Sequence, residues 1–335
     1  TERRPQGPVA DDSWFLNSGL FVQSEYDIDE EYTLTLGARG AFAAVDADKV
    51  FDADSGEVTS FSNEFLGAVG NIGLARQFDD NTLGYIDLSS AFRAPALSDL
   101  SRLGFSSTDL FEIPATDLTP EFSYTAEIGA KLQEPDEWLF TASLWGTLLD
   151  SLIVRVPTGN TDGQGNREVS KQNGGTGFIF GFDLSGRARL VDNLSAFGFL
   201  SWLYGEAERF DQDGNAEDQV IRRMMPLSAQ IGLRYDFLFR DGIEEDVPSL
   251  WVEVYVRAMA EQDDLNDSDI SDTQRVPPGG TPAWTTVNIR GVYSPNDDFS
   301  LYLGVENIFD ENYRVHGSGL NEPGTNVVVT LQVGF

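Results

Sequence analysis

Long segments in which apolar and polar residues alternate constrain this chain more than any other feature. At the C-terminus, one such segment places on a single face the residues Val327, Val329, Leu331, Val333 and Phe335. A period of two residues assigns the apolar and polar sets to opposite faces of a β-strand. Helical periodicity is scarce in the rest of the chain. We therefore expect an all-β protein.

The alternation recurs over about thirteen segments that are longer than most strands of soluble proteins. Their predicted bounds are 12–28, 31–46, 63–77, 82–95, 121–133, 137–157, 168–190, 192–209, 226–239, 249–262, 283–294, 298–310 and 324–335. Strands of soluble domains average about 5 to 6 residues, whereas strands that cross a membrane need about 9 to 11. A soluble antiparallel sandwich also alternates, but the segment lengths favour a transmembrane antiparallel β-barrel.

In such a barrel the apolar set faces lipid and the alternate set faces the interior. The predicted lipid-facing set includes Leu34, Ile128, Leu233, Val254, Leu303 and Leu331. The predicted interior set carries the charged residues Arg39, Glu127, Lys131, Arg234, Asp236, Glu253, Arg257, Arg290 and Glu306. A wet interior tolerates charge that the lipid face does not. These side chains either guide a solute or pair with one another and with a plug.

The connections between the segments alternate in length. Short links lie near 29–30, 79–81, 134–136, 191–192 and 295–297, with a longer one at 240–248. Long links lie at 47–62, 96–120, 158–167, 210–225, 263–282 and 311–323. Outer-membrane barrels have short periplasmic turns and long outer loops. Thirteen strands would place the first strand's start outside, so we expect upstream strands to be missing, unless one segment is not a strand.

Composition excludes several function classes. The 335 residues carry 22 Lys and Arg against 55 Asp and Glu, a net charge of −33, which disfavours nucleic acid as a partner. Without Cys and with one His, His316, the chain lacks thiolate and multi-histidine metal sites, so no metal or cofactor is expected. We also expect no signal peptide, and no transmembrane helix because no apolar run reaches about 18 residues.

Several motifs stand in a fixed order along the chain. Phe92-Arg93-Ala94-Pro95 precedes Leu97-Ser98-Asp99-Leu100, Asp117–Glu121 and Glu127-Ile128-Gly129. Asn173-Gly174 leads to Gly181-Phe182-Asp183-Leu184, and Gly279-Gly280-Thr281-Pro282 precedes a further strand. Val305–Asp310, Tyr313-Arg314 and His316-Gly317-Ser318-Gly319 come last. Together, over residues 12–335, these motifs resemble the barrel of TonB-dependent outer-membrane receptors.

The resemblance implies a 22-stranded barrel filled by an N-terminal plug whose TonB box takes energy from the inner membrane. Residues 1–335 would be the C-terminal part of that barrel, with the plug, the TonB box and the first strands absent. The implied function is uptake of a scarce solute, an iron chelate such as a siderophore, haem or cobalamin, across the outer membrane of a Gram-negative bacterium. The implied partners are outer-membrane lipid, the TonB complex through the missing plug, a small-molecule or metal-chelate ligand, and the missing barrel half or a partner chain.

Within the family, the early loop pattern and Gly279–Pro282 look most like the haemoglobin, haem, transferrin and lactoferrin receptor branch. Haem receptors of that branch usually carry a His between the two mid-barrel motifs, and residues 96–120 contain none. A passive porin or a structural or adhesive barrel is the alternative function. A barrel enzyme is not expected, because His316 would be its only histidine base.

The candidate site residues lie mostly in predicted outer loops. Loop 96–120 is the longest and offers Phe105, Asp109 and Phe111 for ligand contact, because loops carry recognition on a rigid scaffold. His316 either contacts the ligand or is structural. A further group is expected to position or gate the loop: Phe92, Arg93, Pro95, Asp99 and Glu127. The Arg93 fork either holds the loop or plug through carboxylates or fixes the end of its strand.

Overall fold

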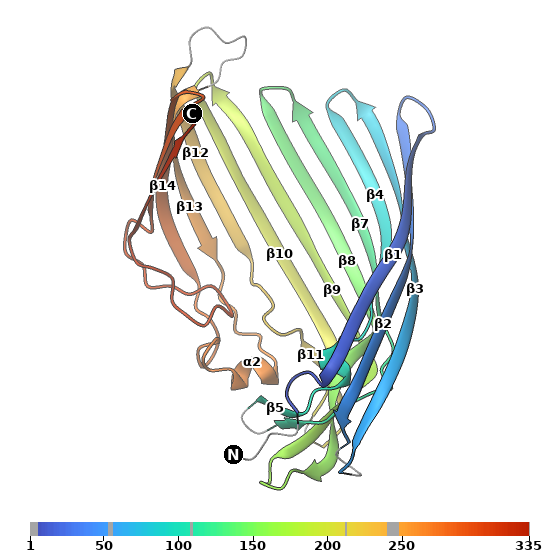
Figure 1. The fold of residues 1–335 in the computed structure, drawn as a ribbon. Helices are drawn as coiled ribbons and strands as arrows, with labels where there is room; N and C mark the ends of the chain where they lie inside the picture. Colours follow the sequence, from blue (N-terminus) through green and yellow to red (C-terminus); the bar gives the residue numbers. More distant parts are fainter. Residues whose placement is uncertain (1–5, 53–55, 108–109, 212, 240–247, 335) are drawn as a thin grey trace.

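The computed structural model describes residues 6–52, 56–107, 110–211, 213–239 and 248–334, which form one large antiparallel sheet with two short helices (Figure 1). Thirteen strands follow one another in the sheet: β1 (Asp11–Asp27), β2 (Tyr32–Phe51), β3 (Val58–Asp79), β4 (Thr82–Arg93), β7 (Glu121–Glu134), β8 (Trp138–Thr161), β9 (Arg167–Val191), β10 (Leu194–Phe210), β12 (Ser228–Phe239), β13 (Pro248–Met259), β14 (Trp284–Asn296), β15 (Phe299–Glu306) and β16 (Asn326–Val333). Each pairs with its chain neighbour. The all-β prediction and the thirteen predicted segments are confirmed.

The sheet curves like part of a barrel wall, and its two edges stay apart. Within the described residues β1 pairs only with β2, and β16 only with β15. The short turns gather at one end, the short-turn end, and the long loops at the other, the loop end (Figure 1). Strand β1 starts at the loop end and β16 finishes at the short-turn end (Figure 1).

Exposure alternates along the strands as the sequence pattern predicts. On β13, Glu253 and Tyr255 are each 7% exposed, whereas Val254 between them is 46% exposed. Of the predicted lipid-facing set, Ile128, Leu233, Leu303 and Leu331 are also exposed, and Leu34 is half-buried. Among the described residues no second sheet covers this outward face. That single layer excludes the sandwich alternative.

Outward-facing aromatic residues form two bands, one toward each end of the strands. The register places Tyr32, Phe78, Phe140, Tyr235 and Tyr293 toward the short-turn end, and Tyr124, Phe178, Phe180 and Tyr204 toward the loop end. Leu and Ile positions such as Ile128 and Leu144 lie between the bands. An apolar band with an aromatic girdle at each edge is the outer surface of a transmembrane barrel.

Two of the predicted long loops are in fact extended hairpins. Strands β2 and β3 stay paired as far as Phe51 and Val58, and β8 and β9 as far as Thr161 and Arg167. The strands therefore take up most of the predicted loops 47–62 and 158–167, and residues 53–55 lie outside the described residues. Polar residues at these positions continue the ladder because strand pairing does not require an apolar face once the strands leave the membrane.

Residues 94–107 and 110–120 fold back onto the concave face of the sheet, and we call this segment the inner loop. It contains α1 (Leu97–Leu100), β5 (Gly104–Ser107) and β6 (Leu110–Glu112). Its side chains Leu100, Ala115 and Leu118 pack against Ala43, Val45 and Phe65 of β2 and β3. Fully burying a residue such as Leu100 contributes about 1.5–3 kcal/mol. The inner loop is thus held by a small apolar core.

The other long loops also carry short elements that the sequence pattern does not predict. Strand β11 (Ala216–Val220) pairs antiparallel with the end of β10, and α2 (Asp267–Ser271) lies between β13 and β14 in the chain. The Asn266 side chain caps α2 by accepting a hydrogen bond from Asp269 N–H and donates to the Val220 carbonyl at 2.9 Å. These contacts pack the outer loops against one another.

Candidate functional site

Arg93, the last residue of β4, ties the inner loop to the sheet. Its guanidinium donates to Glu121 on the opposite strand β7 and to Asp99 Oδ2 at 2.9 Å. Asp99 Oδ2 also accepts from Ala96 N–H at 3.0 Å at the start of α1, and Oδ1 accepts from Lys171 Nζ at 3.0 Å. Arg93 and Asp99 together therefore join the inner loop to β4, β7 and β9.

The charges around Asp99 lower its pKa. Burial acts to raise the pKa of this carboxyl, but the hydrogen bond from Ala96 N–H and the neighbouring Lys171 and Arg93 more than offset burial. Pro95 next to this helix is fully buried. Phe92 packs against Phe122 with ring centroids 5.7 Å apart. Phe92, Arg93, Pro95 and Asp99 thus form the junction between β4 and the inner loop.

Glu112 forms a second ionic centre that the sequence analysis missed. This carboxylate is 0% exposed, and it lies 2.8 Å from Arg155 Nε and 3.0 Å from Lys171 Nζ. Arg102 Nε is farther away, at 3.8 Å. The position is set by β6, which pairs in parallel with Arg167–Val169 of β9. The surrounding cations compensate this carboxylate for its loss of hydration. Glu112 therefore anchors the inner loop.

The two aromatic candidates of the inner loop face each other across the β5–β6 hairpin. The Phe105 and Phe111 rings are 5.7 Å apart in an edge-to-face arrangement. Phe105 is 46% exposed, so part of this pair is open to solvent. Asp109, the third candidate, lies outside the described residues.

Arg209 near the end of β10 is half-buried and differs from the paired cations of the inner loop. Its Nε is shielded from solvent and has no hydrogen-bond partner among the described residues. Arg155 and Arg222 are close enough to repel its charge, and Asp269 is close enough to attract it. The register places Arg209 on the concave face with Ala207, which opposes Gly177. Here a desolvated cation lacks a counter-ion.

Acidic and basic residues of the outer loops pair beside Arg209. Asp272 Oδ2 accepts from Arg222 at 2.6 Å and from Arg223 at 3.2 Å, and the nearly buried Asp269 accepts from Arg223 N–H at 2.8 Å. Burial acts to raise the pKa of Asp272, but the hydrogen bonds from Arg223 and Arg275 lower it overall. These aspartates hold the loops together.

His316 is inside this packing. Its side chain is 4% exposed, and Nδ1 lies 2.9 Å from Thr281 Oγ1 of the Gly279–Pro282 motif. Burial lowers the pKa of the imidazole, which favours the neutral form. In this conformation the ring joins two loops and is not open to an arriving ligand. The acidic turn at Asp211 also has a structural role, because this carboxylate accepts from the N–H groups of Asp213 and Asn215.

Several of the predicted interior charges meet on the concave face. Glu253 lies 2.5 Å from Arg290 Nε and 3.8 Å from Arg234 Nη1, and Arg234 Nε donates to Asp236 at 2.9 Å. The remaining members are more scattered: Glu127 accepts from Tyr85, Arg257 lies over Trp284, Glu306 accepts from Asn326, Arg39 lies beside Gly19, and Lys131 is exposed. Four of the nine charges, Arg234, Asp236, Glu253 and Arg290, are therefore paired with opposite charges within the wall.

The described residues contain no group of three or more His, Cys, Asp or Glu side chains arranged to hold a metal ion. Within the same residues, no helix has the length and apolar character needed to cross a membrane.

Comparison with known structures shows the same architecture. The chain superposes on the copper transporter OprC with a TM-score of 0.74 at 18% identity, over 97% of this chain and 49% of OprC. The FrpB iron transporter from Neisseria meningitidis (F3-3 variant) gives 0.68 at 16%, over 96% and 45%. The E. coli ferric-catecholate import receptor Fiu gives 0.65 at 16%, over 96% and 45%. This chain thus spans about half the length of these structures.

A search of curated protein sequences gives no match. The family model described as "TonB dependent receptor-like, beta-barrel" matches residues 5–308, most of the chain. Members of this family are outer-membrane receptors and transporters. The names of the structural neighbours refer to copper, ferric catecholates, iron and siderophores, so the expected haem and transferrin branch is not confirmed. The match over residues 5–308, with the curved sheet and its girdles, shows that the chain belongs to the TonB-dependent receptor β-barrel family.

Proposed function

We propose that this chain is the C-terminal barrel part of an outer-membrane receptor that imports a negatively charged metal chelate, of the iron–siderophore class. The observation that carries the proposal is Arg209, a half-buried arginine whose shielded Nε has no hydrogen-bond partner among the described residues. It lies at the loop end of the concave face, where an external solute would enter. An anion bound there would complete its hydrogen bonds.

The strongly negative charge of the whole chain makes a cation without a partner unexpected. A net charge of −33 repels an approaching anion, so a site for one requires local positive charge. Arg209 supplies it, since its neighbours Arg155 and Arg222 are already paired with Glu112 and with Asp272. Arginine suits carboxylate and other planar oxyanion groups because its fork can donate two parallel hydrogen bonds. Phe105 and Phe111 offer an exposed aromatic surface on the inner loop.

The names of the structural neighbours agree with a metal or metal-chelate ligand. Fiu imports ferric catecholates, FrpB is an iron transporter, and a Pseudomonas aeruginosa relative was solved with enterobactin. Haem is less favoured because His316 is buried against Thr281 and residues 96–120 contain no His. No feature of the described residues favours cobalamin. A passive porin is also less favoured, because the family works by energy-coupled uptake.

The remaining parts of the receptor follow from the same proposal. The free edges of β1 and β16 would pair with further strands, because unpaired backbone groups in hydrocarbon cost several kcal/mol each. A plug would fill the concave face and pass energy from the TonB complex. Residues 1–335 alone should then fail to form a heat-modifiable, protease-resistant barrel in membranes, whereas the full-length receptor should form one.

Ligand binding by the full-length receptor tests the proposal. We expect Arg209→Ala to weaken binding of an anionic ferric tris-catecholate about 10- to 100-fold, since a hydrogen bond to a charged group contributes about 1.5–3 kcal/mol. Binding of an uncharged ferric hydroxamate should change little, and Arg209→Lys should restore part of the affinity. Arg39→Ala is the matched control, because Arg39 is an exposed cation elsewhere on the concave face. Equal losses in Arg39→Ala and Arg209→Ala, or no loss in either, would reject the site.

A further inference from the structure

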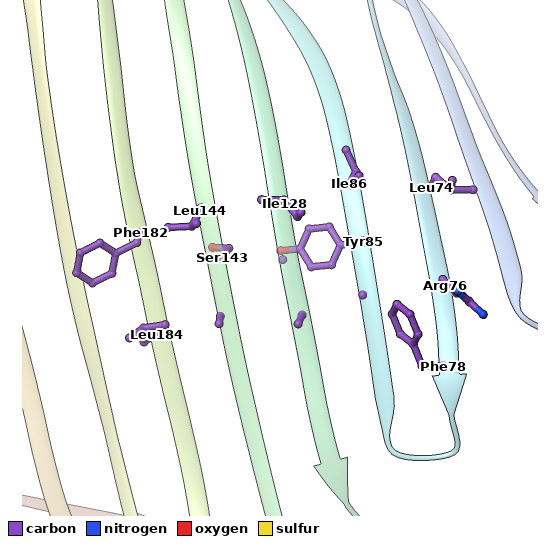
Figure 2. A pocket seen from close by; sticks show the side chains of 14 residues that line it. Leu74, Arg76, Phe78, Tyr85, Ile86, Ile128, Ser143, Leu144, Phe182 and Leu184 are labelled. Carbon is purple, nitrogen blue, oxygen red and sulfur yellow. The ribbon is translucent and has the colours of Figure 1, made fainter.

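An apolar groove runs across the outward face of the sheet, on the side opposite to the concave face. It has a volume of about 820 Å³ and crosses β3, β4, β7, β8 and β9 (Figure 2). This volume is within the ~300–1,000 Å³ of small-molecule sites. Large side chains form its walls, among them Leu74, Ile86, Ile128, Leu144 and Leu184 (Figure 2). The small residues Gly84, Ala130 and Ala142 leave the space between them.

One end of the groove is polar. Arg76 is the only charged residue among the described residues that line it, and it lies toward the β3–β4 turn (Figure 2). Its guanidinium lies 4.7 Å from the Phe78 ring and 5.2 Å from the Tyr32 ring, within the aromatic band of the short-turn end. A charge on the lipid face costs about 2–4 kcal/mol at the bilayer midplane but about 0–1 near the interface. Arg76 therefore lies at the level of lipid headgroups.

Arg76 has a carboxylate at its side. Glu31 Oε2 accepts from Arg76 Nε at 3.2 Å and from Nη2 at 3.0 Å, and the two side chains are 41% and 55% exposed. No described residue accepts from Nη1, so part of the fork is free to donate. A cation with a free donor and an exposed carboxylate thus stand together where the apolar groove ends.

We propose that this groove is a phospholipid-binding site for a zwitterionic, amine-bearing lipid. The lipid phosphate would accept from Arg76, its ammonium group would lie near Glu31, and one acyl chain would lie in the groove over Gly84, Ala130 and Ala142. The pair of opposite charges matches a headgroup that carries both signs, whereas an anionic headgroup would meet Glu31 as a repulsive neighbour. The inference depends on the chain's membrane placement and is independent of the transported ligand.

Quantifying the lipids that remain on the full-length receptor after purification in mild detergent tests this proposal. We expect Arg76→Gln to lower retained phosphatidylethanolamine at least threefold per receptor. Lys49→Ala is its matched control, since Lys49 is an exposed cation paired with Asp12 at the loop end. Unchanged retention in Arg76→Gln, or an equal loss in Lys49→Ala, would overturn the proposal.

Two further variants separate the headgroup contact from the groove. Glu31→Gln should shift the ratio of retained phosphatidylethanolamine to phosphatidylglycerol toward the anionic lipid, because the repulsive carboxylate is gone. Ala130→Phe should fill the groove and reduce retention of both lipids, whereas Ala258→Phe, in a separate outward groove, should not. If Ala130→Phe leaves retention unchanged, or if Glu31→Gln leaves the ratio unchanged, the site as proposed is wrong. Ferric chelate binding should be normal in all these variants, so this test can fail without affecting the proposed transport function.

Discussion

Two ionic regions at the loop end of this barrel wall differ in whether the chain itself supplies the partners of their charged groups. We assign a structural role to the first region and a binding role to the second. Around Glu112, a fully buried carboxylate has Arg155 and Lys171 within 3.0 Å, so every charge is compensated by the chain itself. On β10, Arg209 is shielded at Nε and has no partner among the described residues. The first region holds the inner loop in place. The second is complete only when something else supplies an anion.

Removing the central carboxylate of the first region should have the largest effect. Glu112→Ala leaves the buried Lys171 with Asp99 as its remaining carboxylate partner and removes the Glu112 partner of the more exposed Arg155. Breaking a buried pair costs up to about 3–5 kcal/mol. We expect the inner loop to detach, with cleavage by protease within residues 94–120 of the full-length receptor. Asp213→Ala, in an exposed turn, is the control. A protease pattern like that of the wild type would show that Glu112 does not anchor the loop.

Truncating the aromatic pair should weaken binding without loosening the loop. Phe105→Ala with Phe111→Ala removes the exposed rings, and interface aromatics of this kind contribute about 2 kcal/mol or more. We expect at least about tenfold weaker chelate binding and normal heat-modifiable assembly. A deletion of residues 104–114 is a less specific test because it also removes Glu112. Unchanged affinity in the double variant would show that the ligand does not contact this aromatic pair.

Replacing Arg209 should weaken ligand binding without lowering the stability of the receptor. Arg209→Met removes a desolvated charge that the chain does not compensate, so the free energy of unfolding should stay the same or rise by up to about 1 kcal/mol. Denaturant titration of the full-length receptor measures this. A stability loss above about 2 kcal/mol would mean that Arg209 has a structural partner and that the contrast with Glu112 is false.

Acid should loosen the inner loop by a small amount through Asp99. Its pKa in the folded loop is below the usual 3.8 because Ala96 N–H, Lys171 and Arg93 offset burial. A lowered folded pKa means that the contribution is fully present above pH 3.8 and is lost as pH falls through the folded pKa. We expect protease sensitivity of residues 94–120 to rise below this pH, and Asp99→Asn to flatten the response. An equally steep response in Asp99→Asn would assign the effect to another group.

The sequence predicts the wall of this protein well and its loop packing poorly. Period-two alternation locates all thirteen wall strands, because a lipid-facing side repeats at every second residue. Strands β5, β6 and β11 are too short to show a period, and β6 pairs with β9 only through a parallel contact between Leu110–Glu112 and Arg167–Val169. In the sequence, Glu112 and Arg209 cannot be distinguished from ordinary surface charges. Their neighbours come from distant segments, so only the folded structure shows that Glu112 has charged partners and that Arg209 Nε has none. The motif left two roles open for Arg93, and the structure shows a contact that fits each: Asp99 in the inner loop and Glu121 opposite the strand end.

The most direct test of the account is the depth and direction of its outward face in a bilayer. The chain has no Cys, so single cysteine variants of this part of the full-length receptor can be labelled with a fluorophore at chosen positions. We expect brominated lipid to quench labels at Ile128→Cys, Ile231→Cys and Val254→Cys strongly, and labels at the adjacent positions Glu127→Cys, Gln230→Cys and Glu253→Cys weakly. Quenching that fails to alternate along these strands, or that is absent at the apolar positions, would contradict a membrane-spanning barrel wall.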